Sequence, residues 1–282
     1  QDKLIFFIKE SGKYTIKKLP KLQGLELSID QDSIDGETML VCTLTEPSLR
    51  DKFAIVAKDV AYNSSKFEGD VFLNECKTRI ISWADFLKPS RKGLTKAEHF
   101  GFWGELYMLT QILKPSMDLA NAINCWIGPE RKKQDFTFNK SAIEVKTTLS
   151  GDPNTIKISS LDQLHKITER LFLTNLHINF SNDAMALSLQ DMFNSMEVSL
   201  KDDIDAKTKF LNKASTLYGK ASEDQLEEKF NFLGMETYEI KDGFPLLTGE
   251  NTASAITAVK YSLNSSSLKS YLTELNFEEL LS

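Results

Sequence analysis

The chain has 282 residues, of which 41% are hydrophobic and 26% charged, with a formal net charge of −6. This balance excludes a disordered or fibrous protein, and the length allows one large domain or a few small ones. No apolar run approaches the ~18 residues of a membrane span and no signal peptide precedes the charged opening, so we expect a cytoplasmic protein without membrane partners. The three cysteines, Cys42, Cys76 and Cys125, lack a CxxC pair, which argues against a disulfide framework or a thiolate zinc site.

The charges are unevenly distributed along the chain. Residues 1–90 carry 13 basic against 14 acidic side chains, residues 91–180 carry 12 against 9, and residues 181–282 carry 9 against 17. The net charges are therefore −1, +3 and −8, and only the middle third is basic. It contains the run Arg131, Lys132 and Lys133, which is either a solvated loop or a contact to phosphates, since phosphate neutralisation needs such a local excess.

The first segment, residues 1–90, is predicted to be a β-rich region that ends in a helix. From Lys3 to about Val60, short apolar runs separated by polar turns predict a small antiparallel sheet. These runs are "KLIFFIKE", "GLELSI", "TMLVCTL" and "FAIVAKDV". The following run, "FLNECKTRIISWADFLK", is typical of a helix that ends before Pro89.

Two further segments follow. Residues 91–180 are predicted to form a mixed α/β unit, with the order helix, hairpin, short strand, helix and strand. The corresponding runs are "AEHFGFWGELYMLTQIL", "QDFTFNKSAIEVKTT", "TIKISS", "LDQLHKITERL" and "LHINF". Residues 181–282 are predicted to form an acidic, mainly helical region, with late strands in "METYEI" and "ITAVKYSL".

The predicted hairpin places ionisable side chains on one face. If Asn139 and Lys140 form a two-residue turn, Asp135 faces Glu144, and the period of two adds Lys146 to the same face. Two opposed carboxylates repel each other unless positive charge lies between them. A divalent cation such as Mg²⁺ or Mn²⁺ supplies that charge, but Lys146 alone could also do so as part of a structural ion cluster. The spacing by itself leaves both interpretations open.

A glutamate in the preceding helix also requires a partner. Glu105 lies in an apolar stretch, where an unpaired charge is costly, and Gly101 and Gly104 would let another backbone approach the helix. A salt bridge at the end of the helix would satisfy Glu105. The nearby hairpin makes the outer shell of a metal site the other hypothesis.

These stretches together resemble the PD-(D/E)xK nuclease superfamily, whose core pairs an aspartate on one strand with a Glu-x-Lys on the next. Gln134 replaces the proline of the motif's name. "GFWGELYMLTQIL" resembles the first core helix, with Glu105 at the site-facing position, and "SSLDQLHKI" resembles the helix after the catalytic strand, with Gln163 and Lys166 near the site. With "CWIGPERKKQDF" and "IKISSLDQL", the series looks like the bacterial PD-(D/E)xK motif proteins encoded beside restriction-modification and phage-defence genes. The resemblance covers about residues 75–180 with specific motifs.

The resemblance implies a fold, a reaction and roles for named residues. The fold would be α/β (α+β), with a restriction-endonuclease-like core of a mixed central sheet flanked by helices. The reaction would be Mg²⁺-dependent hydrolysis of DNA phosphodiester bonds in bacterial restriction or phage defence, with Mn²⁺ able to substitute. Asp135, Glu144 and the carbonyl of Val145 would hold the metal, while Lys146 and Gln163 would position the water. The expected nucleic-acid contacts are Arg131, Lys132, Lys133 and Lys166.

A catalytically silent module is the second hypothesis. Such a protein would keep the nuclease fold for DNA binding or as a subunit of a multi-protein defence complex. The intact Asp, Glu and Lys set favours activity, whereas the acidic final third, at −8, suits a protein partner better than DNA. A homo-oligomer is also left open. The sequence lacks the ligand set of a zinc enzyme and the motifs of P-loop nucleotide hydrolases and serine hydrolases.

Overall fold

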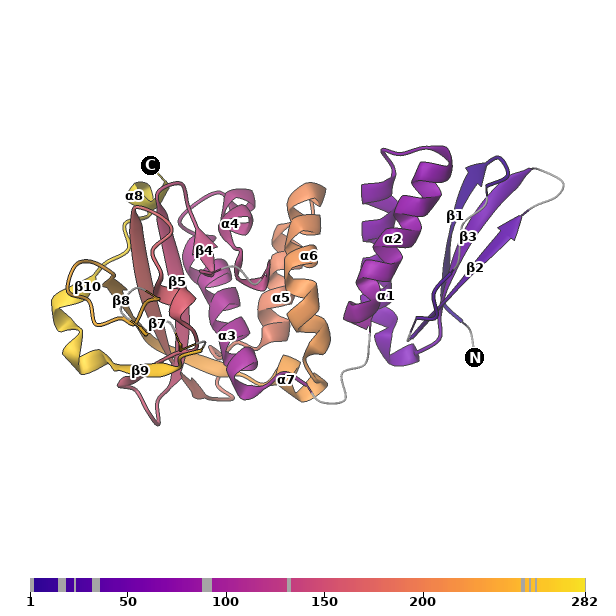
Figure 1. Cartoon of the computed structure of the whole chain (residues 1–282). Helices are drawn as coiled ribbons and strands as arrows, with labels where there is room; N and C mark the ends of the chain where they lie inside the picture. Colours follow the sequence, from indigo (N-terminus) through magenta and orange to yellow (C-terminus); the bar gives the residue numbers. More distant parts are fainter. Residues whose placement is uncertain are drawn as a thin grey trace. The chain divides into compact units, whose positions relative to one another are not determined.

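The computed structural model of the chain describes residues 3–14, 19–22, 24–31, 36–87, 93–130, 133–249, 252–253, 255–256 and 258–281 (Figure 1). The chain divides into two compact units, each with its own sheet. One unit comprises Gln1–Lys92 with Tyr218–Lys220, and the other comprises Gly93–Leu217 with Ala221–Ser282. Within the described residues, no helix is long and apolar enough to cross a membrane.

The first unit confirms the predicted antiparallel sheet. Its strands are β1 (Ile5–Ser11), β2 (Leu25–Gln31) and β3 (Glu37–Leu44), and β3 lies between the other two. Every second residue of β3 is buried, as expected for a sheet that is covered on one face. The chain continues through η1 (Pro47–Leu49), α1 (Arg50–Ser64) and α2 (Gly69–Leu87), so the helix expected before Pro89 is also confirmed.

The strand predicted at "FAIVAKDV" is wrong, because this run lies inside α1. Phe53, Val56 and Val60 are all buried at spacings of three and four, which is the period of one helix face. Asp59 from the same run is buried and forms an ion pair with Arg79 of α2 at 3.0 Å. The contact with α2 therefore decides between two local interpretations of a short apolar run.

The second unit is built on a mixed five-stranded sheet, which agrees with the predicted α/β class. The strand order is β10-β8-β7-β5-β4, with β5 and β7 parallel and the other pairs antiparallel. The strands are β4 (Phe136–Thr137), β5 (Ser141–Leu149), β7 (Arg170–Phe180), β8 (Phe230–Glu239) and β10 (Leu272–Thr273). The helices are α3 (Lys96–Tyr107), which continues as a π-helical turn η2 (Met108–Leu113), α4 (Leu119–Cys125), α5 (Leu189–Ser199), α6 (Ile204–Lys220), α7 (Glu223–Glu227) and α8 (Phe277–Leu281).

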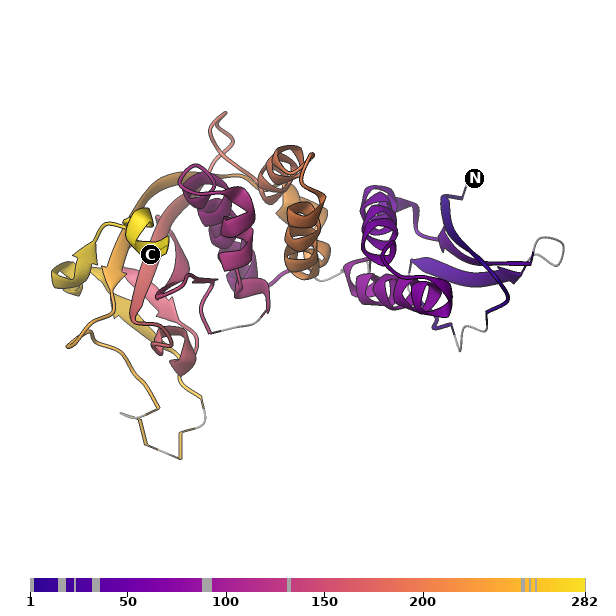
Figure 2. The ribbon, with the colours of Figure 1, turned by 90° about the horizontal axis from the view of Figure 1, so that it is seen from above.

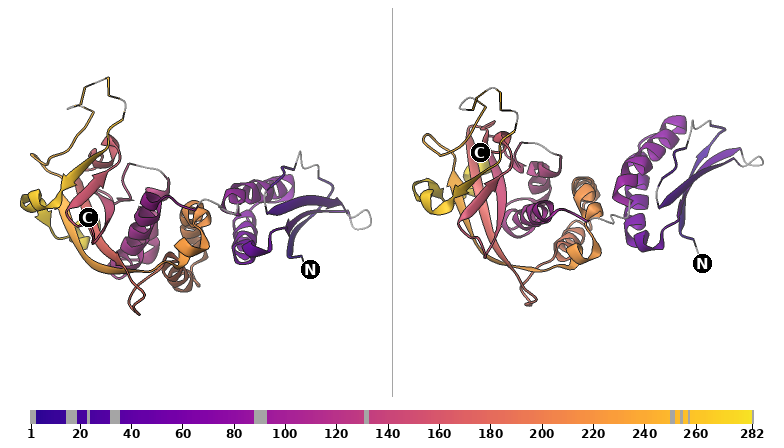
Figure 3. Two further views of the ribbon diagram at one scale, coloured as in Figure 1. Left: turned by 90° about the horizontal axis from the view of Figure 1, so that it is seen from below. Right: turned by 60° about the horizontal axis from the view of Figure 1, so that its bottom comes forward.

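The two faces of this sheet are covered differently. Helix α3 packs on one face, with α5 and α6 beyond it, as Figures 2 and 3 show. The other face is covered by a two-stranded sheet of β6 (Thr155–Ile158) and β9 (Tyr261–Asn264). Short 3-10 turns complete the unit at η3 (Gly128–Glu130), η4 (Leu161–Leu164), η5 (Ser265–Ser267) and η6 (Lys269–Tyr271).

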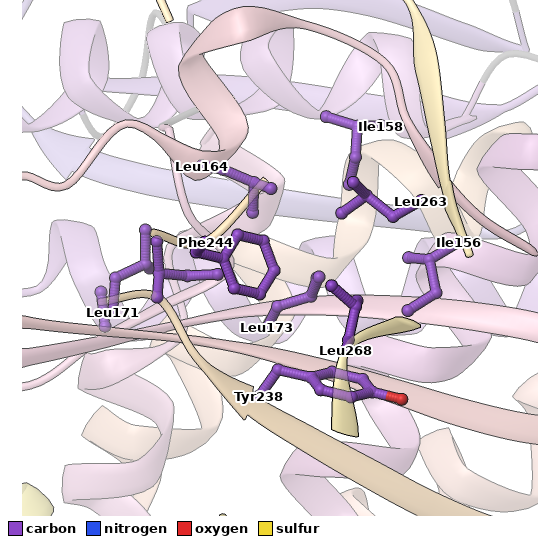
Figure 4. Close-up of a cluster of buried hydrophobic side chains, with 11 residues drawn as sticks. Ile156, Ile158, Leu164, Leu171, Leu173, Tyr238, Phe244, Leu263 and Leu268 are labelled. Atoms are coloured by element: carbon purple, nitrogen blue, oxygen red, sulfur yellow. The ribbon is translucent and has the colours of Figure 1, made fainter. Parts of the chain in front are cut away.

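The apolar core under β6 and β9 fixes the face of β5 that carries Glu144 (Figure 4). Ala142 of β5 belongs to this core, and so does Leu173 of β7, which lies directly beside Glu144 in the parallel register. The remaining members come from β6, η4, β7, β8 and the C-terminal segments: Ile156, Ile158, Leu164, Leu171, Tyr238, Ile240, Phe244, Leu263 and Leu268. The burial of these side chains holds β5 in a single register.

The prediction that residues 181–282 are mainly helical is wrong. After α7 ends at Glu227 the chain forms β8, which lies inside the sheet between β7 and β10, and among the described residues the one later α-helix is the five-residue α8. The run "FNFLGMETYE" is rich in aromatic and branched residues, which suit a strand packed on both sides. The strand expected in "METYEI" is confirmed as the end of β8, and of "ITAVKYSL" the last three residues, from Tyr261, lie in β9.

The helix predicted at "LDQLHKITERL" is also wrong, since only the short turn η4 forms before β7 begins at Arg170. The side chain of Gln134 donates to the carbonyls of His165 at 2.9 Å and Gln163 at 3.5 Å. These carbonyls would accept from N–H groups of the next turn in a continuing α-helix. A contact from a distant segment therefore ends the turn after four residues.

Candidate active site

The hairpin has the register that the sequence predicts. Phe136 pairs with Ile143 and Thr137 with Ala142 in the antiparallel ladder of β4 and β5. The N–H of Phe138 donates to the carbonyl of Ser141 at 2.8 Å. The two-residue turn is therefore confirmed. Asp135 lies just before the first ladder pair, and its N–H donates to the carbonyl of Ile143 at 3.2 Å, beside Glu144.

Asp135 is held by hydrogen bonds to its side chain and its backbone. Its Oδ2 accepts from the N–H of Val145 at 2.8 Å. Its carbonyl accepts from the N–H groups of Ile127 at 2.8 Å and Gly128 at 3.0 Å. The carboxylate thus replaces a backbone partner at the edge of the sheet and is fixed before any ligand binds.

Glu144 and Lys146 are in direct contact on the next strand. The Glu144 side chain is 2% exposed, and its Oε1 accepts from Lys146 Nζ at 2.6 Å. Both side chains belong to the β5 face that β6 and β9 cover. The structure therefore brings the Glu-x-Lys pair of the motif together as one ion pair.

Helix α3 supplies a third carboxylate. The helix starts at a capping box of Thr95 and Glu98, and Gly104 gives it close access to β5, because a Cβ there would lie 2.0 Å from Thr147 Oγ1. Glu105 is the next residue. Its Oε2 accepts a hydrogen bond from the indole Nε1 of Trp126 at 2.7 Å.

Gly128 marks the point where two of the carboxylates meet. A Cβ at this position would lie 2.3 Å from Glu105 Oε2 and 2.9 Å from Asp135 Oδ1. Both distances are shorter than van der Waals contact, so only glycine leaves both carboxylates their present positions. The absent side chain thereby lets an oxygen of each carboxylate lie close to the backbone of Gly128.

The three carboxyl groups hold one another in an electrostatically unfavourable state. Burial raises the pKa of Glu105 well above its usual range, and the charge of Asp135 raises it further. Burial likewise raises the pKa of Asp135, against the opposing effects of Lys146 and of the Val145 N–H. Burial, followed by the charge of Asp135, raises the pKa of Glu144 to about 8. Within the part of the chain that the structure describes, Lys146 alone does not offset the charge of these carboxyl groups.

The residues present fit a small divalent cation. Mg²⁺ and Mn²⁺ prefer oxygen donors, and oxygens of Glu105 and Asp135 both lie close to Gly128. In the part of the chain that the structure describes, no three His, Cys, Asp or Glu side chains form a ready set of metal ligands. The set implied by the sequence needs only two side chains, Asp135 and Glu144, with the carbonyl of Val145. Glu105 would then act from the outer shell.

The other predicted site residues are placed less directly. Gln163 lies in η4, where its Oε1 accepts from the N–H of Ser159 at 2.8 Å. Lys166 is exposed on the segment after η4, and Lys133 is exposed and pairs with Asp162 at 3.7 Å. Arg131 and Lys132 lie outside the described residues. The structure thus joins Glu105, Asp135, Glu144 and Lys146, whereas Gln163 is engaged in its own turn.

Two residues at the site are not predicted by the sequence. Trp126 has the pattern of a core residue, and it is buried, but its indole also holds Glu105. Gly128 carries no motif of its own. Its one signal in the sequence is the Gly-Pro pair after Trp126 and Ile127, which marks a turn close to the motif.

Comparison with known proteins identifies the family of the chain. Residues 1–266 match the model of a family described as "Putative PD-(D/E)XK family member, (DUF4420)". The chain belongs to this family. The match spans nearly the full length of the chain, so it includes the first unit as well as the candidate site in the second unit. No curated protein and no solved structure matches the chain.

Proposed function

We propose that this PD-(D/E)XK family member is a Mg²⁺-dependent endonuclease that hydrolyses phosphodiester bonds of DNA on a restriction-endonuclease-like core. One observation carries the proposal. Among the described residues, three carboxylates, the buried Glu144 and the largely buried Glu105 and Asp135, are gathered beside a single lysine, and the missing side chain of Gly128 lets two of them lie close together. Family membership supports the same conclusion.

A purely structural ion cluster accounts poorly for this arrangement. Lys146 pairs with Glu144, whereas the close donors to Glu105 and Asp135 among the described residues are the Trp126 indole and the Val145 N–H. Buried like charges at short range destabilise a fold, so a cluster that served stability alone would replace them with neutral groups. A site that loads a divalent cation needs this excess of negative charge.

The residues divide the chemistry among them. Asp135 and Glu144 would bind the metal with the carbonyl of Val145, whose backbone is already fixed by the bond from its N–H to Asp135. When bound, Mg²⁺ polarises the scissile phosphate and lowers the pKa of a coordinated water. Lys146 would orient the attacking water and offset charge on the phosphate in the transition state, where a positioned cation is most effective. Glu105, held by Trp126, would act from the outer shell of the metal site.

DNA would approach through the basic middle of the chain. Lys133 and Lys166 are exposed on the segments that flank the hairpin and η4, and Arg131 and Lys132 precede Lys133 in the sequence. Such side chains position a duplex through its phosphates without reading its bases. A role in restriction or phage defence, with protein partners from such a system, is the biological setting that we propose.

A catalytically silent nuclease-fold module is the second candidate, and one contact favours it. Lys146 Nζ lies 2.6 Å from Glu144, a geometry that suits a closed ion pair. In this case the protein binds DNA or a defence partner and cleaves nothing. The two candidates differ in whether the carboxylates take up a metal ion that supports turnover.

A cleavage assay separates them. Supercoiled plasmid and linear duplex would be incubated with wild-type protein and with Asp135→Asn, in Mg²⁺, Mn²⁺ or EDTA. The amide of this variant keeps an oxygen that can accept from the Val145 N–H, so the variant should fold. We expect cleavage by the wild type with either metal and none by the variant. Wild-type protein that binds DNA but stays inert, even with defence partners added, would support the silent module.

A further inference from the structure

Helix α6 contacts the segment that holds two of the candidate catalytic carboxylates. The segment, here called the Trp126 segment, comprises residues 126–128. It runs beside β4, with Trp126 forming an isolated antiparallel bridge to Phe136. It donates from Trp126 to Glu105 and from Ile127 and Gly128 to the carbonyl of Asp135.

Lys213 of α6 binds the backbone at the start of this segment. Its Nζ donates to the carbonyls of Ile123 at 3.0 Å, Asn124 at 3.3 Å and Trp126. The first two are the last carbonyls of α4, which have no partner inside the helix, and a cation is also favoured at the negative end of a helix dipole. One ammonium group therefore joins the end of α4 to the residue that holds Glu105.

Phe210 completes the contact from α6. It lies three residues before Lys213, on the same face of the helix, and its ring centroid is 6.1 Å from that of Trp126. Phe210 and Trp126 are both fully buried. Trp126 is thus held at its ring by Phe210 and at its carbonyl by Lys213, while its indole N–H points to Glu105.

From this chain of contacts we infer that Lys213 is a positioning residue for the metal site, acting through the Trp126 segment on Glu105 and Asp135. The inference rests on the proposed function, because it gives Lys213 a role in the geometry of that site. Without the ammonium, three carbonyls lose their donor, and the Trp126 segment loses the contact that fixes its backbone. Supporting groups behind metal ligands commonly change metal affinity by about 10- to 100-fold when they are removed.

Lys209 offers a matched control on the same helix. Its Nζ donates to the side chain of Asn124 at 3.1 Å and therefore touches the end of α4 without reaching the Trp126 segment. Lys209→Met removes a positive charge one turn from Lys213. Any general effect of lost charge or helix propensity on α6 should appear equally in both methionine variants.

The experiment compares wild type, Lys213→Met, Lys213→Arg and Lys209→Met. Mn²⁺ affinity would be measured by titration calorimetry well below the melting temperature. Protein labelled with 5-fluorotryptophan would give three ¹⁹F resonances, one for each tryptophan, and Trp126→Phe would assign the one from Trp126. This readout reports on the Trp126 segment even if the protein has no activity.

We expect Lys213→Met to weaken Mn²⁺ binding about tenfold and to move the Trp126 resonance while those of Trp83 and Trp103 stay in place. Lys213→Arg should restore both properties to within about threefold of wild type, and Lys209→Met should leave both unchanged. If Lys213→Met does not fold, Lys213→Gln takes its place and should move the Trp126 resonance in the same comparison.

An unmoved Trp126 resonance in the Lys213 variant would overturn the inference, and so would Mn²⁺ affinity within about twofold of wild type. If the wild-type protein binds no Mn²⁺, the proposed function fails instead. The resonance comparison still decides whether Lys213 controls the Trp126 segment. The two failures are therefore distinguishable.

Discussion

Glu144→Gln removes a carboxyl group that is 2% exposed and replaces it with a neutral side chain of the same shape. Its pKa rises from the ordinary 4.5 to about 8 in the folded protein, first because of burial and then because of Asp135. A raised carboxyl pKa means that the folded state holds the proton more tightly than the unfolded state. The stability that this group contributes is complete below pH 4.5 and is lost as the pH rises to about 8.

The size of the loss follows from the interval between the two pKa values. Each pH unit within it lowers the free energy of unfolding by about 1.4 kcal/mol, so the full interval gives about 5 kcal/mol as an upper value. Relaxation of a buried site reduces this to about 2–4 kcal/mol. In EDTA, Glu144→Gln should therefore match the wild type near pH 5 and be more stable by about 2–4 kcal/mol at pH 8.

Urea unfolding between pH 5 and pH 8 in EDTA tests this prediction. Tryptophan fluorescence of a Trp83→Phe background reports on the second unit, because Trp103 and Trp126 lie there and Trp83 lies in the first unit. Glu239→Gln is the control, because Glu239 pairs with Arg170 at 2.8 Å on the half-exposed edge of the same sheet. Glu239→Gln should lower the free energy of unfolding by up to about 1 kcal/mol and should not raise it at high pH. If Glu144→Gln is the less stable protein at pH 8, Glu144 is the negative half of a structural ion pair, and the reasoning fails.

Three further outcomes are expected. Lys146→Ala should keep Mg²⁺ and DNA binding but slow single-turnover cleavage by about two to three orders of magnitude, and equal losses in binding and rate would assign the lysine to binding. Gly128→Ala should lower Mn²⁺ affinity at least about tenfold in calorimetry, because its Cβ would displace Glu105 and Asp135, whereas Gly101→Ala, with open space at that position, should leave it unchanged. Replacing the basic run by alanine should weaken DNA binding for all sequences. The slope of log affinity against log salt concentration should become smaller by about 2–3, and an unchanged slope would make the run a solvated loop. The run comprises Arg131, Lys132 and Lys133.

The parts of the fold that the sequence predicted are those that depend on short-range rules. The β4–β5 register follows from a two-residue turn and the period of two, so the place of Asp135 beside the β5 residues that flank Glu144 could be predicted. The strand prediction for "FAIVAKDV" failed because a short apolar stretch suits either a strand or one face of a helix. Packing against α2 decides in favour of the helix. The prediction of a long helix in place of η4 failed because Gln134, about 30 residues earlier in the sequence, donates to carbonyls that a continuing helix would use.

The candidate site divides in the same way. Asp135, Glu144 and Lys146 lie within one hairpin, and Glu105 lies in a helix whose apolar surroundings required a partner. The groups that support them come from other parts of the chain. Lys213 reaches the Trp126 segment across 87 positions, and no periodicity or motif connects the two. Contacts of this kind follow from the packing of α6, which the sequence pattern does not specify.

The most direct test of the account is a crystal structure of the protein soaked in Mn²⁺, with anomalous diffraction collected at the manganese edge. We predict an anomalous peak bonded to Asp135, Glu144 and the carbonyl of Val145, with Glu105 one water away. Lys146 should then have left Glu144 and should face the open side of the metal. Full soaking that gives no peak at these residues, with Lys146 still paired to Glu144, would contradict the metal-dependent nuclease.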